Sequence, residues 1–412
     1  MLAAVLMLAG ANGARGQQAG PICAWGDWGN GVAPDGYYVA VSAGFQHSLA
    51  IHVDGTLRAW GSPAFQLNQV PSRLLNAQVV AISCGYAHNL VLLADGTIDG
   101  WGEPANPQNP LNVAPGQAPP ADPRETTYVA IAAGEHVSVA VRSDGTLVSW
   151  GEHSSSNCGD DTCTPDCGPG LPIGPWPFVA ATPSGNDFIA VSASGHFALA
   201  LRDSSTLVAW GVNGRCQVTD AYVGEVSVFS AGHYHGTVIN AFTGAYSGWG
   251  WDNFGQVSAT PWANYPASCP PGCASVGESC QQCYRPPPVP FDQPIQIESG
   301  YFHNIAQRPD LSLFGWARNS VGQATPPKGN FIAFSSKYNH GLAIELVSSD
   351  GAYMNYDGSS TGERYTVGDV ISHFQAVLAG DPEADSDGDG TLDAGDLACF
   401  LDRFARVVGG AP

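Results

Sequence analysis

The sequence predicts an all-β chain folded as a seven-bladed β-propeller, followed by a small α-helical module, and three observations predict this. A strand pattern recurs seven times, and a tryptophan-containing strand also recurs seven times. Residues 355–408 hold two copies of an acidic loop followed by a short helix-like segment. The 51 glycines, 31 prolines and only 12% charged residues suit many short strands joined by tight turns.

Each repeat contains three expected strands. The first copy, VAVSAGFQHSLAIHVDGTLRAWG over residues 39–61, has a strand ending in Ser-Ala-Gly, a second strand, a turn, and a strand ending in Trp-Gly. Apolar residues alternate with small or polar ones, which is typical of strands with one buried face. The Asp-Gly pairs at Asp54, Asp95 and Asp144 predict hairpin turns, because glycine accepts the positive φ that such turns need.

The positions of the two strand series predict how the ring closes. The first-strand motif occurs near Gly44, Gly85, Gly134, Ser194, Gly232, Gly300 and Lys337. The tryptophan strand contains Trp25, Trp60, Trp101, Trp150, Trp210, Trp249 and Trp316. The series are offset by one, so the chain starts with an orphan tryptophan strand. We expect this strand to complete the last blade and remove the exposed sheet edges, giving a propeller over residues 17–354.

The repeats carry further shared features, which are Gly-x-x-His, Asp-Gly-Thr, Trp-Gly, and an Asn shortly before Gly-Gln. The last feature includes Asn253 with Gln256, and Asn319 with Gln323. Over roughly residues 20–356 the chain resembles the regulator of chromosome condensation (RCC1) family. That family includes a nuclear nucleotide-exchange factor and a secreted bacterial inhibitor of β-lactamases. The resemblance implies the propeller fold and neither of those activities.

A histidine recurs at one repeat position, at His47, His88, His235, His303 and His340, while blades three and four carry Val137 and Phe197 there. A catalytic base is needed once, in one asymmetric site. A residue repeated around a ring is better explained as a packing or strand-linking element than as a metal ligand or catalyst. The sequence shows no hydrolase elbow, phosphate-binding loop or zinc-protease motif, so we expect a protein that is not an enzyme.

The charge disfavours some classes of partner, and the N-terminus predicts an extracellular location. The net charge is −21, with Lys328 and Lys337 as the two lysines, which disfavours nucleic acids and anionic membrane surfaces as partners. Residues 1–16 contain a short apolar run that is too short to span a bilayer. Ala14 and Gly16 occupy the positions that a signal peptidase reads, which predicts a signal peptide cleaved before Gln17 and a secreted protein.

Two insertions, 152–188 and 257–294, occupy the longest gaps between tryptophan strands. Both follow a Trp-Gly strand, so we expect them on one face, where inserted loops usually form a binding surface. Disulfides are expected among their cysteines, with Cys216 a further candidate partner. Zinc binding by the second cluster stays open as an alternative. The clusters are Cys158, Cys163 and Cys167, and Cys269, Cys273, Cys280 and Cys283.

Residues 385–396, DSDGDGTLDAGD, have the spacing of an EF-hand-like calcium-binding loop. Gly390 takes the sharp turn at position 6, and apolar residues at helical spacing follow the loop. The first loop of the module is three residues longer than twelve, so it departs from the spacing of a calcium-binding loop. The expected ligands are Asp385, Asp387, Asp389, Thr391, Asp393 and Asp396, with Asn355, Asp357, Ser359 and Asp369 as a possible second set.

The aspartate at position 12 and the duplicated loop–helix unit make residues 355–408 similar to dockerin modules. They resemble most closely the dockerin-like segments of secreted proteins from planctomycete-type bacteria, including the Ala379 to Pro382 joint. Dockerins bind cohesin domains on a scaffold. The resemblance therefore implies that the calcium-loaded tail attaches the propeller to a cohesin-like or other cell-envelope anchor.

Three functions compete at this stage. The leading one is a secreted scaffold that binds a protein or glycan partner. The second is an inhibitor of a secreted or periplasmic enzyme, which needs aromatic side chains to cap an active site. The third is a polysaccharide-active enzyme, which needs two converging carboxylates. The aromatic candidates are Trp176, Trp251, Trp262 and Tyr265, and the acidic candidates are Asp160, Asp161 and Asp187.

Overall fold

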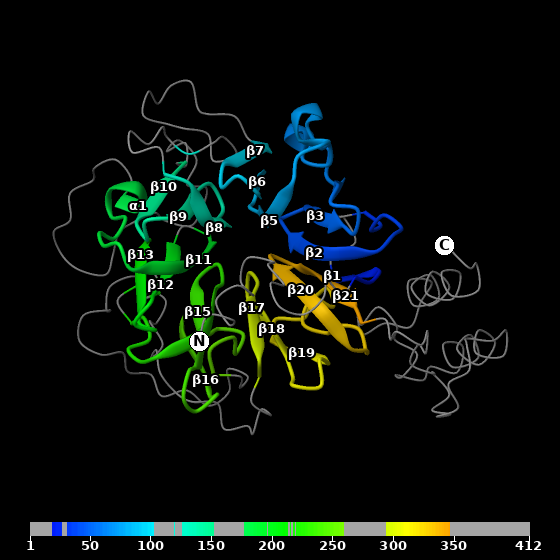
Figure 1. Cartoon of the computed structure of the whole chain (residues 1–412). Coiled ribbons are helices and arrows are strands. Elements are labelled where there is room, and N and C mark those ends of the chain that lie inside the picture. Colours follow the sequence, from blue (N-terminus) through cyan, green and yellow to red (C-terminus); the bar gives the residue numbers. More distant parts are fainter. Residues whose placement is uncertain are drawn as a thin grey trace, which may run out of the picture.

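The computed structural model describes residues 19–26, 31–102, 119, 126–151, 177–195, 197–212, 215, 217–218, 220–258 and 294–346. Within these residues the chain forms seven sheets of three antiparallel strands, arranged around a central axis (Figure 1). Each sheet is one propeller blade, so the expected all-β fold and the number of blades are confirmed. None of the described helices has the length and apolar character needed to cross a membrane.

The three strands of each blade have constant positions. The inner strands, which correspond to the first strand of each repeat, are β2 (Tyr38–Ala43), β5 (Val79–Cys84), β8 (Tyr128–Ala133), β11 (Phe188–Ser194), β14 (Val226–Ala231), β17 (Gln296–Ser299) and β20 (Phe331–Lys337). The middle strands, which begin at or next to the histidine position, are β3 (His47–His52), β6 (His88–Leu93), β9 (Ser138–Arg142), β12 (Phe197–Arg202), β15 (His235–Asn240), β18 (His303–Gln307) and β21 (His340–Glu345). The outer strands, which carry the tryptophans, are β4 (Leu57–Gly61), β7 (Ile98–Gly102), β10 (Leu147–Trp150), β13 (Leu207–Gly211), β16 (Tyr246–Gly250), β19 (Leu313–Ala317) and β1 (Ile22–Gly26).

The N-terminal strand closes the ring, as the offset of the two series predicts. β1 pairs with β21, with Ile22 opposite Ile344 and Trp25 opposite Gly341. In Figure 1 the blue β1 lies beside the orange end of β21. Blade 7 is therefore built from β20, β21 and β1, the two ends of the repeat region. This closure pairs β21 on both sides, so the middle strand of blade 7 has no exposed edge.

Three short elements lie between blades within the described residues. Two 3-10 turns, η3 (Ala64–Gln66) and η4 (Ser72–Leu74), connect blades 1 and 2. One helical turn, α1 (Pro177–Ala180), lies within the first predicted insertion, and Phe178 of this turn is buried beside Trp210. The C-terminal end of that insertion is thus packed onto the core of blade 4. The rest of the insertion lies outside the described residues.

The hairpin turns show why the repeats prefer Asp-Gly. Gly55 has φ +84°, and Asp54 accepts a hydrogen bond from the Thr56 backbone N–H at 2.8 Å. Blades without this glycine still need the same backbone geometry, because Ser205 and Leu311 have φ of +63° and +72°. Positive φ costs a residue with a side chain roughly 1–2 kcal/mol, so the fold tolerates exceptions but favours glycine.

A first set of hydrogen bonds, here called the serine bridges, joins neighbouring blades near the axis. The backbone N–H of each receiving inner strand donates to the hydroxyl of a serine in the preceding blade. The bonds are Cys84 to Ser42 (3.0 Å), Ala133 to Ser83 (3.0 Å), Ala231 to Ser192 (3.0 Å), Ser299 to Ser230 (2.9 Å) and Ala43 to Ser335 (3.1 Å). Blades 3 and 6 have Ala132 and Glu298 at the serine position, so five of the seven seams carry this bridge.

Candidate functional site

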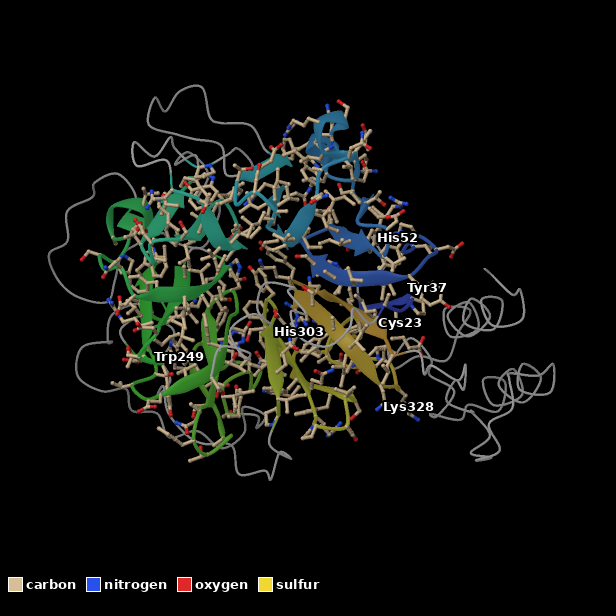
Figure 2. All side chains as sticks on the ribbon, viewed as in Figure 1. Cys23, Tyr37, His52, Trp249, His303 and Lys328 are labelled. Carbon is tan, nitrogen blue, oxygen red and sulfur yellow. The ribbon has the colours of Figure 1, made fainter. Side chains whose placement is uncertain are left out.

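The recurring histidines link neighbouring blades through a second set of hydrogen bonds, here called the histidine bridges. In each case Nε2 bonds to a side chain of the next blade around the ring. The pairs are His47 with Asn89 (2.9 Å), His88 with Ser138 (3.0 Å), His235 with Asn304 (2.8 Å), His303 with Ser336 (2.8 Å) and His340 with Ser48 (3.2 Å). In Figure 2 His303 lies nearer the centre of the ring than Trp249. The strand-linking interpretation is thus confirmed for all five residues.

The bridges favour neutral imidazoles. All five histidine side chains are at most 2% exposed, and their Nδ1 atoms have no hydrogen-bond partner among the described residues. A proton on Nδ1 would leave a buried N–H without an acceptor, which is costly. Burial accordingly lowers the pKa of His47 and His235 to about 4, and that of His303 and His340 to about 3. These histidines are therefore neutral near pH 7 in the folded protein.

The two blades that lack the histidine use apolar packing instead. Val137 belongs to a cluster that spans blades 3 and 4 and includes Val139, Phe188 and Trp210. Because Ala132 also removes the serine bridge at this seam, apolar contact replaces both kinds of bridge there. Phe197 is fully buried in a cluster shared by blades 4 and 5. The sequence exceptions therefore have a structural cause.

One end of the central channel is closed by aromatic rings from the loops between inner and middle strands. Tyr338 lies on the axis, because its ring contacts Phe45, Tyr86, His233 and Tyr301, which belong to four other blades. Its side chain is 1% exposed. Backbone hydrogen bonds link the same loops, for example from Phe45 N to Gly85 O at 3.2 Å and from Tyr301 N to Tyr338 O at 3.0 Å. This end is therefore a rigid, closed plug.

An aromatic patch lies on the same face, at the loops of blades 5 and 6, and consists of Tyr234, Trp251, Phe254, Tyr301 and Phe302. Trp251 contacts Tyr234 and Phe302 edge-to-face, at centroid distances of 5.2 and 4.9 Å. Phe254 contacts Phe302 at 5.1 Å and is 42% exposed. The rings support one another, so the patch presents a firm apolar surface rather than separate mobile side chains.

Two arginines border the aromatic patch. The Arg215 guanidinium lies 4.6 Å above the Trp251 ring. The Arg318 guanidinium lies 5.5 Å from the Phe254 ring and 5.6 Å from the Phe302 ring. Cation–π contacts hold these long side chains in place and so lower the entropy lost when a partner binds. Trp, Tyr and Arg are the residue types most enriched at the energetic centres of protein interfaces.

The central cavity contains two charged side chains. It has a volume of about 130 Å³ and is lined by the inner strands of all seven blades, including Glu298 and Lys337. Lys337 Nζ reaches across the axis and donates to the backbone oxygens of Cys84, at 2.9 Å, and Ala133. Burial lowers the Lys337 pKa to about 8 and raises the Glu298 pKa to about 7.

The predicted site residues divide into those the structure describes and those it does not. Trp251 lies in the aromatic patch, whereas Trp176, Trp262 and Tyr265 lie outside the described residues. Asp187 forms an ion pair with Arg202 instead of joining a carboxylate pocket. Both calcium loops, the two cysteine clusters and Cys216, the residues 1–16, and Asp160 with Asp161 lie outside the described residues. Of the described cysteines, Cys23 and Cys84 are both buried.

The cavity positions of Lys337 and Glu298 and the axial plug were not predicted from the sequence. The signal was available in the alignment of the repeats, because Lys337 replaces a glycine or serine and Glu298 replaces a serine or alanine. The repeat pattern also paired Asn253 with Asn319 as the asparagine that precedes Gly-Gln. The structure gives that role to Asp252, whose Oδ1 accepts from Val257 N at 2.7 Å, as Asn319 Oδ1 accepts from Ala324 N at 2.8 Å.

Comparisons with known proteins agree with these repeats. The profile of the regulator of chromosome condensation (RCC1) repeat matches residues 38–65 and 79–106. The ultraviolet-B receptor UVR8 of Arabidopsis thaliana is 32% identical over 130 residues, which is 31% of this chain and 24% of the receptor. The chain thus contains repeats of this kind. The match spans about a quarter of the receptor's length.

Solved structures share the fold. The structure of Prp20p from Saccharomyces cerevisiae, described with its binding to Gsp1p and histones, has a TM-score of 0.60 at 14% identity and covers 84% of this chain and 95% of that one. Human WBSCR16 gives a TM-score of 0.56 at 16% identity, covering 80% of this chain and 99% of that one. Yeast RCC1 (Prp20) bound to Kap60 gives 0.59 at 15% identity, covering 84% of this chain and 92% of that one. The chain is therefore similar in fold to RCC1-type propellers.

Proposed function

We propose that this chain is a secreted, non-enzymatic scaffold whose propeller binds a partner protein through the aromatic patch of blades 5 and 6. The observation that carries the proposal is the mutual support of five rings and two guanidinium groups at one face, with Phe254 exposed to solvent. Such surfaces gain affinity from apolar burial at low entropic cost. The yeast propeller with the same fold is described as binding proteins, which favours a protein over a glycan as the partner.

The test compares patch variants with a matched variant on the opposite face. Phe254→Ser and Arg318→Glu alter the patch, while Phe242→Ser alters an exposed phenylalanine in the hairpin between β15 and β16. Each full-length protein is immobilised and incubated with secreted and envelope proteins of the parent organism, and bound proteins are quantified by mass spectrometry. We expect wild type and Phe242→Ser to retain the same set of bound proteins. Both patch variants should retain at least tenfold less of each of these proteins. Equal retention by all four proteins would refute the patch as the binding surface.

The tail supplies the second half of the proposed function. Residues 355–408 form a dockerin-like module that binds Ca²⁺ through Asp385, Asp387, Asp389, Thr391, Asp393 and Asp396 and anchors the propeller to the cell surface or an extracellular complex. The ligand spacing of this loop supports the proposal. The loop with Asn355, Asp357, Ser359 and Asp369 is a possible second calcium site, and disulfides within the insertions remain part of the proposal.

Calcium titration of the full chain tests the metal site. Asp387→Ala removes one of the carboxylates expected to bind the ion, so we expect calorimetry to show loss of the tightest Ca²⁺ site. Asp357→Ala is the matched variant in the other loop and leaves that site unchanged. Unaltered binding in Asp387→Ala would contradict the assignment. Export is tested separately, by N-terminal sequencing of the mature protein, with Gln17 as the expected first residue.

An inhibitor of a secreted enzyme is the second candidate, because the aromatic patch includes Trp251 and could cover an active-site opening. This function uses the same surface, with an enzyme as the partner protein. A panel of secreted and periplasmic hydrolases, including β-lactamases, distinguishes the two. Inhibition that is lost in Phe254→Ser and kept in Phe242→Ser would establish the inhibitor, while binding without any inhibition supports the scaffold.

A further inference from the structure

Two residues that break the repeat lie in the central cavity. Glu298 occupies the position where five blades have the bridging serine, and Lys337 occupies the position where five blades have glycine. Both side chains line the same cavity of about 130 Å³, and both residues are half-buried. Among the described residues that line the cavity, these two carry a charge. A ring built for apolar and hydroxyl contacts therefore contains one charge of each sign.

The two charges face the cavity with bonding capacity left over. Lys337 Nζ has three N–H donors and uses two of them for Cys84 O and Ala133 O. The Glu298 carboxylate makes no hydrogen bond or ion pair within the part of the chain that the structure describes, and it does not form an ion pair with Lys337 there. Two opposite charges thus share one small space without neutralising each other directly.

The surroundings of the cavity make two unpaired charges energetically unfavourable unless a bound group contacts both of them. The cavity wall also contains Val41, Ile82, Ile131 and Val191, and its serine hydroxyls accept hydrogen bonds in the serine bridges. In such surroundings an unpaired charge is less stable than in water, while an electrostatic contact is stronger. The raised pKa of Glu298 and the lowered pKa of Lys337 reflect that cost. A bound group that carries both charges would remove it.

We propose that the central cavity binds a small zwitterion of the amino-acid class, with its ammonium group on Glu298 and its carboxylate on Lys337. A volume of about 130 Å³ equals the space of roughly four water molecules, which suits a ligand of a few non-hydrogen atoms. The aromatic plug around Tyr338 closes one end. Entry is from the other end, where Val80, Val129 and Ile295 at the start of the inner strands are exposed.

Calorimetry on the full chain tests the site with glycine, β-alanine and γ-aminobutyrate, which carry the same two charges at increasing separation. Acetate and methylammonium, each with one charge, are the controls. We expect at least one zwitterion to bind at submillimolar concentration and raise the melting temperature, and the single-charge controls, alone or together, to have no effect. At pH 7 binding releases about half a proton from Glu298, which makes the measured enthalpy depend on the buffer.

The variants restore the repeat, so they preserve the fold. Glu298→Ser and Lys337→Gly each introduce the residue that most other blades have, and each should weaken binding at least tenfold. Gln296→Ala changes an uncharged residue of the same cavity and should retain binding. The proposal is overturned if no zwitterion binds to wild type, or if Glu298→Ser and Lys337→Gly bind as wild type does. Either result means that Glu298 and Lys337 do not hold a zwitterion in the cavity. Neither result affects the aromatic patch.

Discussion

Acidification should unfold this propeller through its histidine bridges. Five imidazoles are buried in the neutral form, with pKa values of about 4 for His47 and His235, about 3 for His303 and His340, and well below the usual value for His88. In the unfolded chain they titrate near pH 6.5. The unfolded state therefore binds more protons below pH 6.5, so stability is complete above this pH and is lost as the pH falls towards the folded pKa.

The linkage relation gives the magnitude. Between pH 7 and pH 5 His47, His235, His303 and His340 each remove about 2 kcal/mol from the free energy of unfolding, about 8 kcal/mol together. His88 acts in the same direction. Glu298 acts in the opposite direction, because its pKa is raised to about 7 and it binds a proton in the folded state first. It offsets at most about 2 kcal/mol over the same range. The net loss from these four histidines and Glu298 is about 6 kcal/mol, which is comparable with the whole stability of a typical domain.

Urea unfolding of the full chain at pH 8, 7, 6 and 5 measures this loss. The matched variant is His235→Gln, whose amide N–H can donate to Asn304 Oδ1 but does not titrate. We expect it to reduce the slope of the free energy against pH, between pH 6 and 5, by about 1 kcal/mol per unit. A change below about 1 kcal/mol between pH 7 and 5 in wild type, or an equal slope in His235→Gln, would refute the reasoning.

Two further substitutions test the blade seams. Ser42→Ala removes the acceptor of the Cys84 N–H and should lower the free energy of unfolding in urea by about 1–3 kcal/mol. Ser184→Ala, at an exposed serine, is the control and should leave it unchanged. Equal effects of the two substitutions would show that the serine bridge contributes nothing. Gly85→Ala places a Cβ 2.4 Å from the His88 ring and 2.5 Å from a backbone oxygen, so it should cost about 3 kcal/mol or more. Gly55→Ala is the control, because its Cβ meets open space and only the positive φ opposes it, so it should cost about 1–2 kcal/mol. Thermal melts in which Gly55→Ala is more destabilising than Gly85→Ala would contradict the packing argument.

Much of the fold follows from local patterns. Period-two alternation and Asp-Gly turns mark strands and hairpins, because both reflect the chemistry of a few neighbouring residues. The offset between the tryptophan series and the inner-strand series predicts that β1 completes blade 7, and the pairing of Trp25 with Gly341 confirms it. The repeated histidines were recognised as structural because a catalyst is not needed five times.

The neighbours of the candidate site residues could not be predicted from the sequence. Trp251 was identified as a candidate aromatic residue, but its neighbours Tyr234, Phe302 and Arg318 come from separate loops of two blades. Their proximity depends on how blades 5 and 6 pack around the ring. Asp187 was considered as a catalytic carboxylate, but Arg202 on the adjacent middle strand forms an ion pair with it.

The sequence by itself determined the number of blades, the strand that closes the ring and the structural nature of the histidines, since each depends on repetition along the chain. Only the tertiary structure decided which groups those side chains meet. His47 bonds to Asn89, 42 residues away, and His235 to Asn304, 69 residues away. Lys337 reaches the oxygens of Cys84 and Ala133 across the axis, 253 and 204 residues away in the chain. Such contacts exist because ring closure places seven distant segments around one axis. A local sequence pattern does not indicate which of these distant residues will meet.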